Sequence, residues 1–382
     1  MEKKNKSNGM VDLFPREIIL DILSRLPSEA VLQCKLVCKS WRNLLRSCDA
    51  YRRFQLYYGE YTCNSNANTI NTVVQIHHPP CSFFGFVLGS CNGLILSCQP
   101  NTCADKQKNL YLSNPMKREY LNLPIQEEPT VCGFGYDTSA GVYKVVRMDP
   151  DRVTRGDMVH VYTVGSGVGW RRKENIAQMR CSRFGGFTGI PCNGALHWLD
   201  YKNRIWTFDL ADEEFRCIPS PQFQLAAVND HFELRLLGEC LSLVHYKDSR
   251  TILDIWLLKR NDKERKRNNS TVNEKLDYYK LSSWNWSKEF SLTEVLCEHY
   301  DPVDIVDPFA LTKNGELLLF SRTTTEVYRY TMKSTKSVYD KEKLNDGAHV
   351  RLYVRTAMPY KKSFVSLKDL GEDVKIFDLV TR

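Results

Sequence analysis

Residues 91–97 read CNGLILS, an Asn-Gly pair followed by an apolar run, and two later stretches repeat this pattern. They are CNGALHWLD at 192–200 and KNGELLLFS at 313–321. Asn-Gly favours the two-residue turn of a β-hairpin, because both central residues of that turn need a positive φ. Each repeat therefore predicts a hairpin turn that leads into a buried strand.

The spacing of these turns predicts a larger repeat. Their glycines, Gly93, Gly194 and Gly315, are 101 and 121 residues apart. The hydrophilic insert around KRNDKERKRNNSTVNEK accounts for the 20 extra residues of the second interval. Two stretches that resemble each other, at 132–148 and 237–259, lie between the Asn-Gly turns. This leaves one unit per ~50 residues, the period of four-stranded propeller blades. About six such units fit the chain from residue 61 onward.

The first fifty residues have a helical period instead. Pro15 favours the first turn of a helix, and an apolar stripe follows at Ile18, Ile19, Ile22, Leu23 and Leu26. Pro27 ends this helix, and two shorter apolar segments predict two more. Three helices in about forty residues rarely form a stable domain alone. Periodicity leaves two interpretations open: a helical cap on the rest of the chain, which it favours, or a docking module for another protein.

Residues 13–47, LFPREIILDILSRLPSEAVLQCKLVCKSWRNLLRS, resemble an F-box, although Phe14 separates Leu13 from Pro15 and SEAVLQC replaces a more usual segment. The resemblance implies docking on the Skp-type adaptor of a cullin-based (SCF) ubiquitin ligase, and through it on cullin and RING subunits. Trp41 is the expected hot spot, because large aromatic side chains bury the most area. Carried over by position, the resemblance assigns adaptor contacts to Leu13, Pro15, Ile18, Ile22, Leu26, Pro27, Leu32, Val37, Cys38 and Trp41.

The rest of the chain resembles the F-box-associated, kelch-like domain of plant F-box proteins. The resemblance rests on GSCNGLILS, NPMKREYLNLP, GFGYDTSAGVYKVVR, NGALHWL, LDIWLLK and the terminal SFVSL, without the double-glycine strands of classical kelch repeats. We therefore expect an α+β multidomain chain with a disordered tail at 1–10 and a small three-helix F-box at 11–58. An all-β propeller-like domain of about six blades follows at 61–382, with a basic loop insert at 259–277.

A propeller must also close its ring. The C-terminal stretch RLYVRTAMPYKKSFVSL is expected to complete a blade with strands near residues 70–90, because the first and last strands otherwise keep unpaired edges.

Composition fits an ordinary globular protein, with 42% hydrophobic and 26% charged residues and no apolar run long enough for a membrane helix. The formal charge of +8 allows an acidic partner without requiring nucleic acid. No secretory signal is recognised, so the 14 cysteines are expected to be reduced and the chain to be cytoplasmic, nuclear or both. No metal-ligand spacing occurs among them.

Motifs of catalysis are missing from the sequence, which contains no GxSxG, P-loop or HExxH. His197 is expected to be a core histidine, and GSGVG at 165–169 a hairpin turn rather than a phosphate site. The basic insert is expected to be a solvated loop rather than a nuclear address. We expect no catalytic residue, cofactor or metal.

The two resemblances together imply a non-catalytic substrate-recognition subunit of an SCF ubiquitin ligase. The F-box would hold the adaptor, and the propeller would present an unidentified target protein for ubiquitination and proteasomal degradation. The sequence names no target-binding residue. Two alternatives stay open: a propeller enzyme or small-molecule sensor tethered by the F-box, which requires a pocket with converging polar groups, and a basic nuclear nucleic-acid-binding protein, which requires a continuous basic face.

Overall fold

The computed structural model describes residues 86–99, 109–123, 131–150, 157–173, 188–200, 202–221, 230–247, 252–260, 284–293, 306–312, 315–321, 327–331, 338–342, 360 and 363–376. The predicted tail at 1–10 and the predicted F-box at 11–58 lie outside these residues, as do the first residues of the predicted propeller. Every helix or strand assigned within the described residues is a β-strand.

The strands form five consecutive units of four, which we number as blades 1 to 5. Blade 1 contains β1 (Phe86–Cys91), β2 (Leu94–Gln99), β3 (Asn109–Asn114) and β4 (Glu119–Leu123). Blade 2 contains β5 (Val131–Asp137), β6 (Val142–Pro150), β7 (Asp157–Thr163) and β8 (Trp170–Lys173). Blade 3 contains β9 (Thr188–Cys192), β10 (Ala195–Leu199), β11 (Ile205–Asp209) and β12 (Phe215–Ile218).

The remaining strands build the last two described blades and one addition to the first. Blade 4 contains β13 (His231–Leu237), β14 (Cys240–Lys247), β15 (Ile252–Arg260) and β16 (Trp284–Thr293). Blade 5 contains β17 (Val306–Leu311), β18 (Leu317–Ser321), β19 (Val327–Thr331) and β20 (Val338–Glu342). The C-terminal β21 (Lys375–Ile376) pairs with β4 as a fifth strand of blade 1.

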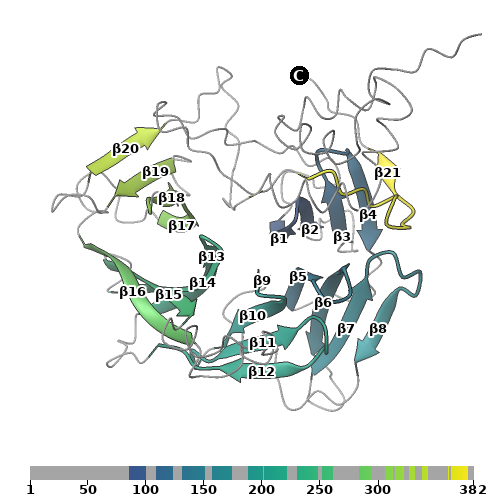
Figure 1. Ribbon diagram of the computed structural model, residues 1–382, viewed down its shortest axis with the longest axis horizontal. Helices are drawn as coiled ribbons and strands as arrows, with labels where there is room; N and C mark the ends of the chain where they lie inside the picture. The colour runs from purple at the N-terminus through teal and green to yellow at the C-terminus, as the bar shows by residue number, and fades with distance from the viewer. Residues whose placement is uncertain are drawn as a thin grey trace, which may run out of the picture.

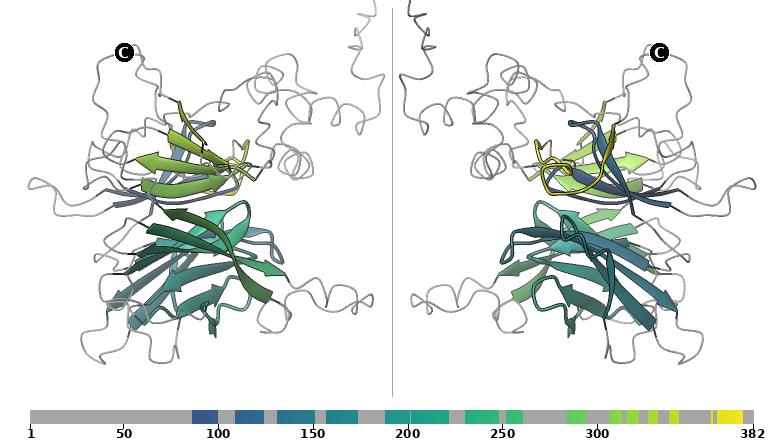
Figure 2. Two further views of the ribbon diagram at one scale, coloured as in Figure 1. Left: turned by 90° about the vertical axis from the view of Figure 1, so that its left-hand side faces the viewer. Right: turned by 90° about the vertical axis from the view of Figure 1, so that its right-hand side faces the viewer.

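The blades are arranged around a ring, with β1, β5, β9, β13 and β17 nearest the centre and the fourth strand of each blade at the periphery (Figure 1). Within each blade neighbouring strands are antiparallel, so that consecutive hairpin turns alternate between the two ends of the ring, seen from the sides in Figure 2. This is the expected all-β, propeller-like arrangement. Five of the predicted six blades fall within the described residues.

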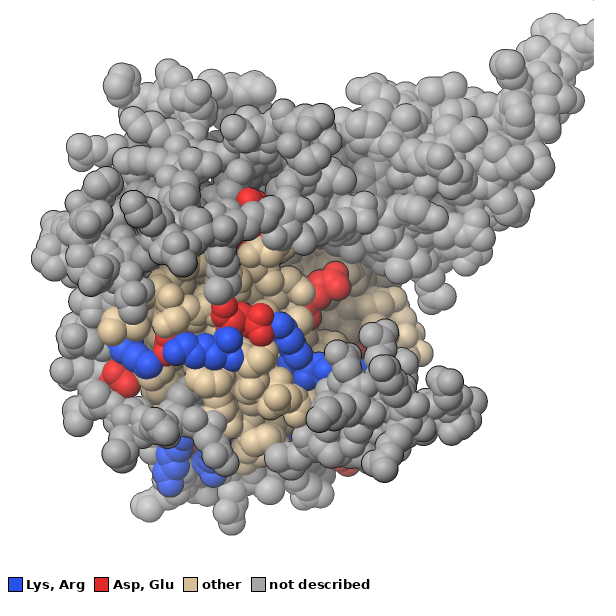
Figure 3. Space-filling model, turned by 60° about the vertical axis from the view of Figure 1, so that its left-hand side comes forward, with Lys and Arg blue, Asp and Glu red and all other residues tan. Residues whose placement is uncertain are grey.

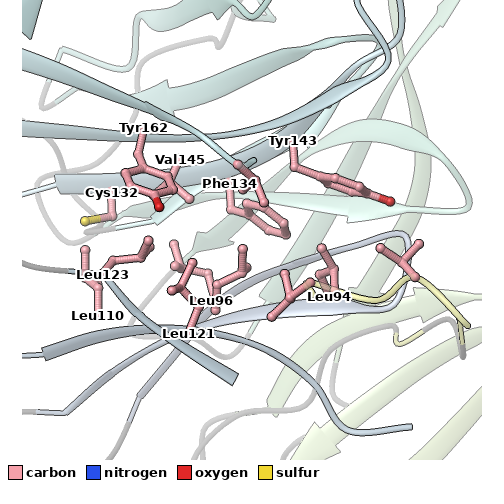
Figure 4. Close-up of a cluster of buried hydrophobic side chains, with 14 residues drawn as sticks. Leu94, Leu96, Leu110, Leu121, Leu123, Cys132, Phe134, Tyr143, Val145 and Tyr162 are labelled. Carbon is pink, nitrogen blue, oxygen red and sulfur yellow. The ribbon is translucent and has the colours of Figure 1, made fainter. Parts of the chain in front are cut away.

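Hydrophobic residues pack between successive blades rather than in one central core. Between blades 1 and 2, leucines of β2, β3 and β4 meet Phe134, Val145 and Tyr162 of blade 2 (Figure 4). Similar clusters join blade 2 to blade 3, blade 3 to blade 4, and blade 4 to blade 5. Blades 2, 3 and 4 therefore each bury both faces by contact with a blade on either side.

Two of the three predicted Asn-Gly turns are confirmed, and the third lies in the longer connection 312–316 between β17 and β18, with Asn314 outside the described residues. Asn92 and Gly93 have φ angles of 48° and 80°, and Asn193 and Gly194 have 50° and 74°, as a two-residue turn with positive φ at both positions requires. Gly315 also has a positive φ, of 78°. The short turns fix the register of the inner hairpins, so that the apolar run after each turn lies in a buried strand.

Blades 2 and 3 are joined by an additional pairing of their innermost strands. Strands β5 and β9 run parallel, with Gly133 opposite Gly189, which makes one sheet of eight strands. The indole ring of Trp198 lies against both glycines: a Cβ built on Gly189 would be 2.5 Å from the ring and one on Gly133 would be 2.8 Å from it. Only glycine therefore leaves room for the buried Trp198 side chain at these two positions.

The C-terminal strap, which we define as residues 363–376, crosses blades 1 and 2. The amide of Asn114 donates hydrogen bonds to the carbonyls of Ser363 and Val365, at 3.0 and 2.5 Å. The carboxylate of Glu119 accepts hydrogen bonds from the backbone N–H of Leu367 and the hydroxyl of Ser366. Val365 and Leu367 are buried in the cluster between blades 1 and 2. The strap thus attaches the end of the chain to its first described blade, but residues 363–367 form no β-strand there, and β1, the described part of the expected partner region, pairs with β2. The expected partner strands before residue 86 lie outside the described residues.

Candidate functional site

The ten predicted adaptor-binding residues lie outside the described residues, so their placement stays a prediction. The described propeller is the part expected to bind a target. Within it, the candidate surfaces are the two ends of the ring and the charged groups that are exposed there.

The two ends differ in the length of their connections. At the end that we call the short-turn end, the first and second strands of a blade are joined by turns as short as Asn92–Gly93, although the longest connection, 261–283 between β15 and β16, also lies at this end. At the opposite, long-connection end, strands are joined by segments such as 174–187 and 294–305. Variable connections on a rigid scaffold are where binding residues of repeat proteins usually lie. Because the connections between blades lie there, the long-connection end is the better candidate for recognition, with 261–283 as the one comparably long connection at the other end.

A row of charged side chains lines the innermost strand of blade 4 near this end. His231, Glu233 and Arg235 alternate along β13, with side-chain exposures of 41, 23 and 29%. Glu233 accepts from His231 Nε2 at 3.0 Å and forms an ion pair with Arg235. Asp307 of β17 lies 3.8 Å from Arg235 and accepts a hydrogen bond from the Tyr246 hydroxyl.

The charges in this row interact closely. Burial alone would lower the pKa of Arg235, but the neighbouring Glu233 and Asp307 carboxylates raise it above its usual value. Burial, followed by the same two carboxylates, raises the pKa of Tyr246. These charged groups can position a polar partner.

A second charged cluster joins blades 2 and 3 at the short-turn end. Lys144 of β6 is buried and lies 3.1 Å from Glu213 and 3.3 Å from Asp137, while Arg171 donates to Glu213 at 2.7 Å. Burial would raise the pKa of Glu213, but the hydrogen bonds and charges of Arg171 and Lys144 hold it below its usual value. Because every member is paired within the cluster, it fastens the two blades rather than forming a binding site.

On the side of the ring drawn in Figure 3, positive and negative side chains are interleaved. In blade 4, the buried carboxylate of Asp254 pairs with both Lys247 and Lys288, and Lys259 pairs with Glu289. Among the described residues of this face, the lysines and arginines therefore do not form the continuous basic face that nucleic-acid binding would require. Lys259 and Arg260, the first two residues of the predicted basic insert, belong to β15, and the rest of that insert lies outside the described residues.

The two candidate chemical motifs have structural roles. His197 is fully buried in β10, its Nδ1 lies 3.0 Å from the Ile190 carbonyl, and burial lowers its pKa to about 4. It is the core histidine that the sequence predicted. The GSGVG segment is the turn between β7 and β8, with positive φ at Gly165, Gly167 and Gly169.

No group of three or more metal-ligating side chains is found within the described ranges. The described part of the chain also contains no helix long and apolar enough to cross a membrane.

Comparison with known proteins places these features in a family. Residues 44–331 match the F-box associated beta propeller domain, and residues 12–53 match the F-box domain. The chain belongs to the F-box proteins with an F-box-associated β-propeller domain. The propeller match covers most of the chain, including blades 1 to 4 of the structure.

Relatives in Arabidopsis thaliana carry the same family name. F-box protein At3g07870 is 27% identical over 303 residues, which are 66% of this chain and 70% of that protein. F-box/kelch-repeat protein At3g23880 is 25% identical over 287 residues, which are 64% of this chain and 75% of that protein. The resemblance to plant F-box proteins is thereby confirmed. Among solved structures, the Cps50 (Swd1) beta-propeller domain of Myceliophteria thermophila aligns with a TM-score of 0.34 and 9% identity, over 66% of this chain and 84% of that one.

Proposed function

We propose that this chain is the substrate-recognition subunit of an SCF-type ubiquitin ligase. The observation that supports the proposal is the occurrence, in one chain, of an F-box match at 12–53 and of a separate propeller whose blades bury their faces against one another. A ring that packs in this way does not need a helical lid. The apolar stripe around Leu26 is then better explained as an interface for the adaptor than as a cap.

In this proposal the chain itself catalyses no reaction. The F-box holds the Skp-type adaptor, and the propeller holds a target protein near the ubiquitin that a separate conjugating enzyme carries. Holding both in one assembly raises their effective concentration, which is the contribution of a receptor subunit. The chain would act in the cytoplasm, the nucleus or both.

The first test compares adaptor co-purification by the full-length chain and by a variant with Leu26→Ala and Pro27→Ala. We expect the double substitution to remove most adaptor binding, because it truncates the predicted apolar contact and the helix end beside it. A matched control replaces Lys202, an exposed residue of blade 3, with alanine and should bind the adaptor normally. Equal adaptor binding by the double variant and the wild type would refute the assignment of the F-box interface.

A further inference from the structure

A row of three basic side chains crosses blade 2 on the face that packs toward blade 1. The strand register places Arg147 of β6 opposite His160 of β7, and His160 opposite Arg172 of β8. Alternate residues of the same strands, Val145 and Tyr162, lie in the cluster between blades 1 and 2, so the row shares that face. Three residues on consecutive strands are thus brought side by side, near the end of β6 and the start of β7, at the long-connection end.

One carboxylate orients two members of this row. Asp149 is buried, and its Oδ2 lies 3.2 Å from Arg147 Nε and 3.4 Å from His160 Nδ1. The guanidinium of Arg147 also lies over the indole ring of Trp170, with 5.0 Å between its Cζ atom and the ring centroid. A planar guanidinium with a carboxylate near one edge and an aromatic ring at one face is restricted in the directions of its N–H groups.

The hydrogen bonds of this cluster are incomplete. Arg147 is only 7% exposed, yet its Nη1 has no hydrogen-bond partner within the part of the chain that the structure describes. The same holds for Oδ1 of Asp149, and also for Arg147 Nε and His160 Nδ1, whose contacts with Asp149 are ion-pair distances rather than hydrogen bonds. An unpaired buried polar group costs about 1–3 kcal/mol, and more when it is charged, so native structures normally supply a partner, from the protein, from ordered water or from a bound ion.

Exposure increases along the row toward the outside of the blade. Arg147 is buried, the His160 side chain is 16% exposed, and Arg172 on the peripheral strand is exposed. No ion pair or hydrogen bond of Arg172 is found among the described residues. With one carboxylate against two guanidinium groups, the acidic and arginine side chains of the cluster sum to a charge of +1.

We infer that this basic row between blades 1 and 2 is a binding site for an anionic oxygen group, a carboxylate or a phosphoryl group. Arg172 meets the anion at the surface, and Arg147 Nη1 supplies a fixed donor deeper in the blade. Arginine is suited to both groups because its fork of N–H donors matches their oxygens. Asp149 Oδ1 can accept the hydroxyl of a singly protonated phosphoryl group or of a water molecule that accompanies the anion.

The inference rests on the proposed function in one respect, the source of the anion. A substrate receptor at this end of its propeller would take it from an acidic or phosphorylated side chain of the target.

The test measures peptide binding by the full-length chain in complex with its adaptor. Three fluorescent pools have degenerate flanks around a central glutamate, phosphoserine or glutamine. We expect one or both anionic pools to bind about tenfold more tightly than the glutamine pool, and increasing salt to weaken them. Arg172→Ala should remove this preference without disturbing the fold, since the side chain is exposed. Lys202→Ala, which removes an exposed charge on another blade, is the matched control and should keep it.

Arg147→Lys extends the test to the buried end while keeping the charge. It should weaken the anionic pools, because an ammonium group lacks the planar fork, and its adaptor binding and melting temperature show whether the variant is folded. A preference for phosphoserine alone identifies a phosphoryl site, and one for both pools a general anion site. Equal binding of all three pools by a complex that still holds the adaptor would overturn the anion site and leave the receptor role intact. Failure of the chain to bind adaptor would instead count against the proposed function.

Discussion

The attachment of the C-terminal strap to blade 1 depends strongly on one side chain. Asn114 is fully buried, and its amide donates to the carbonyls of Ser363 and Val365. Its side-chain oxygen accepts from the backbone N–H of Met116 at 2.9 Å and so stabilises the turn that leads into β4. Each of these three hydrogen bonds contributes about 1 kcal/mol, and the strap carbonyls would lose their donor. Asn114→Ala should therefore lower the free energy of unfolding by about 3 kcal/mol.

Denaturation in urea measures the loss, and hydrogen–deuterium exchange shows its position. Exchange of residues 365–371 should accelerate before that of blade 3. Asn114→Asp is a second test, because it keeps the turn acceptor but places a carboxylate against two carbonyls, and it should destabilise more than alanine. Asn122→Ala removes an exposed asparagine from β4 of the same blade and is the control. If Asn114→Ala were as stable as this control, with strap exchange unchanged, the strap would not depend on Asn114.

Three further predictions follow from buried contacts. Gly189→Ala should destabilise the ring by about 1–3 kcal/mol in urea denaturation, because the new Cβ would lie 2.5 Å from the Trp198 ring. The control Gly89→Ala should have little effect, because the nearest atom to its Cβ would be 3.9 Å away. Equal stability of the two variants would contradict the close packing. Glu213→Gln should cost about 1–3 kcal/mol by removing the charge that pairs with Lys144 and Arg171, while Glu214→Gln, at a side chain that is 65% exposed, should not. Four buried carboxyl groups have pKa values below the usual 3.8 for Asp and 4.5 for Glu, because hydrogen bonds and positive neighbours outweigh burial: Asp137, Asp200, Glu213 and Asp254. The stability that these groups contribute should therefore be complete above the usual values and fall as the pH drops below them. A melting temperature that acid leaves unchanged would contradict this.

Local turn chemistry explains what the sequence could predict of the fold. Asn-Gly has a strong preference for positive φ at both positions, so the turns at 92–93 and 193–194 and the buried strands after them follow from the residues alone. The turn between β13 and β14 is formed by Gly238 and Glu239, with φ angles of 57° and 67°. A glutamate has no such preference, and the equivalence of this turn to the Asn-Gly turns is visible only in the structure.

Contacts between distant segments explain what the sequence could not predict. Asn114 belongs to the NPMKREY motif on which the family resemblance rests, but its hydrogen bonds reach residues 249 and 251 positions away. The basic row also depends on pairing that the sequence does not state. Arg147, His160 and Arg172 become neighbours only through the registers in which β6 pairs with β7 and β7 pairs with β8. In the sequence, the row is visible only as one basic residue near the same end of each of three successive strands. These three residues can be recognised as neighbours only when the turns that join the strands are known.

The central claim is that the N-terminal module of this chain binds a Skp-type adaptor while its propeller stays available for a target. Hydrogen–deuterium exchange of the full-length chain, with and without purified adaptor, tests it most directly. We predict slower exchange across residues 13–41 when the adaptor is present, unchanged exchange in blades 2 to 4, and loss of the protection in Trp41→Ala. Identical exchange across residues 13–41 at saturating adaptor, or protection confined to the propeller, would contradict the claim.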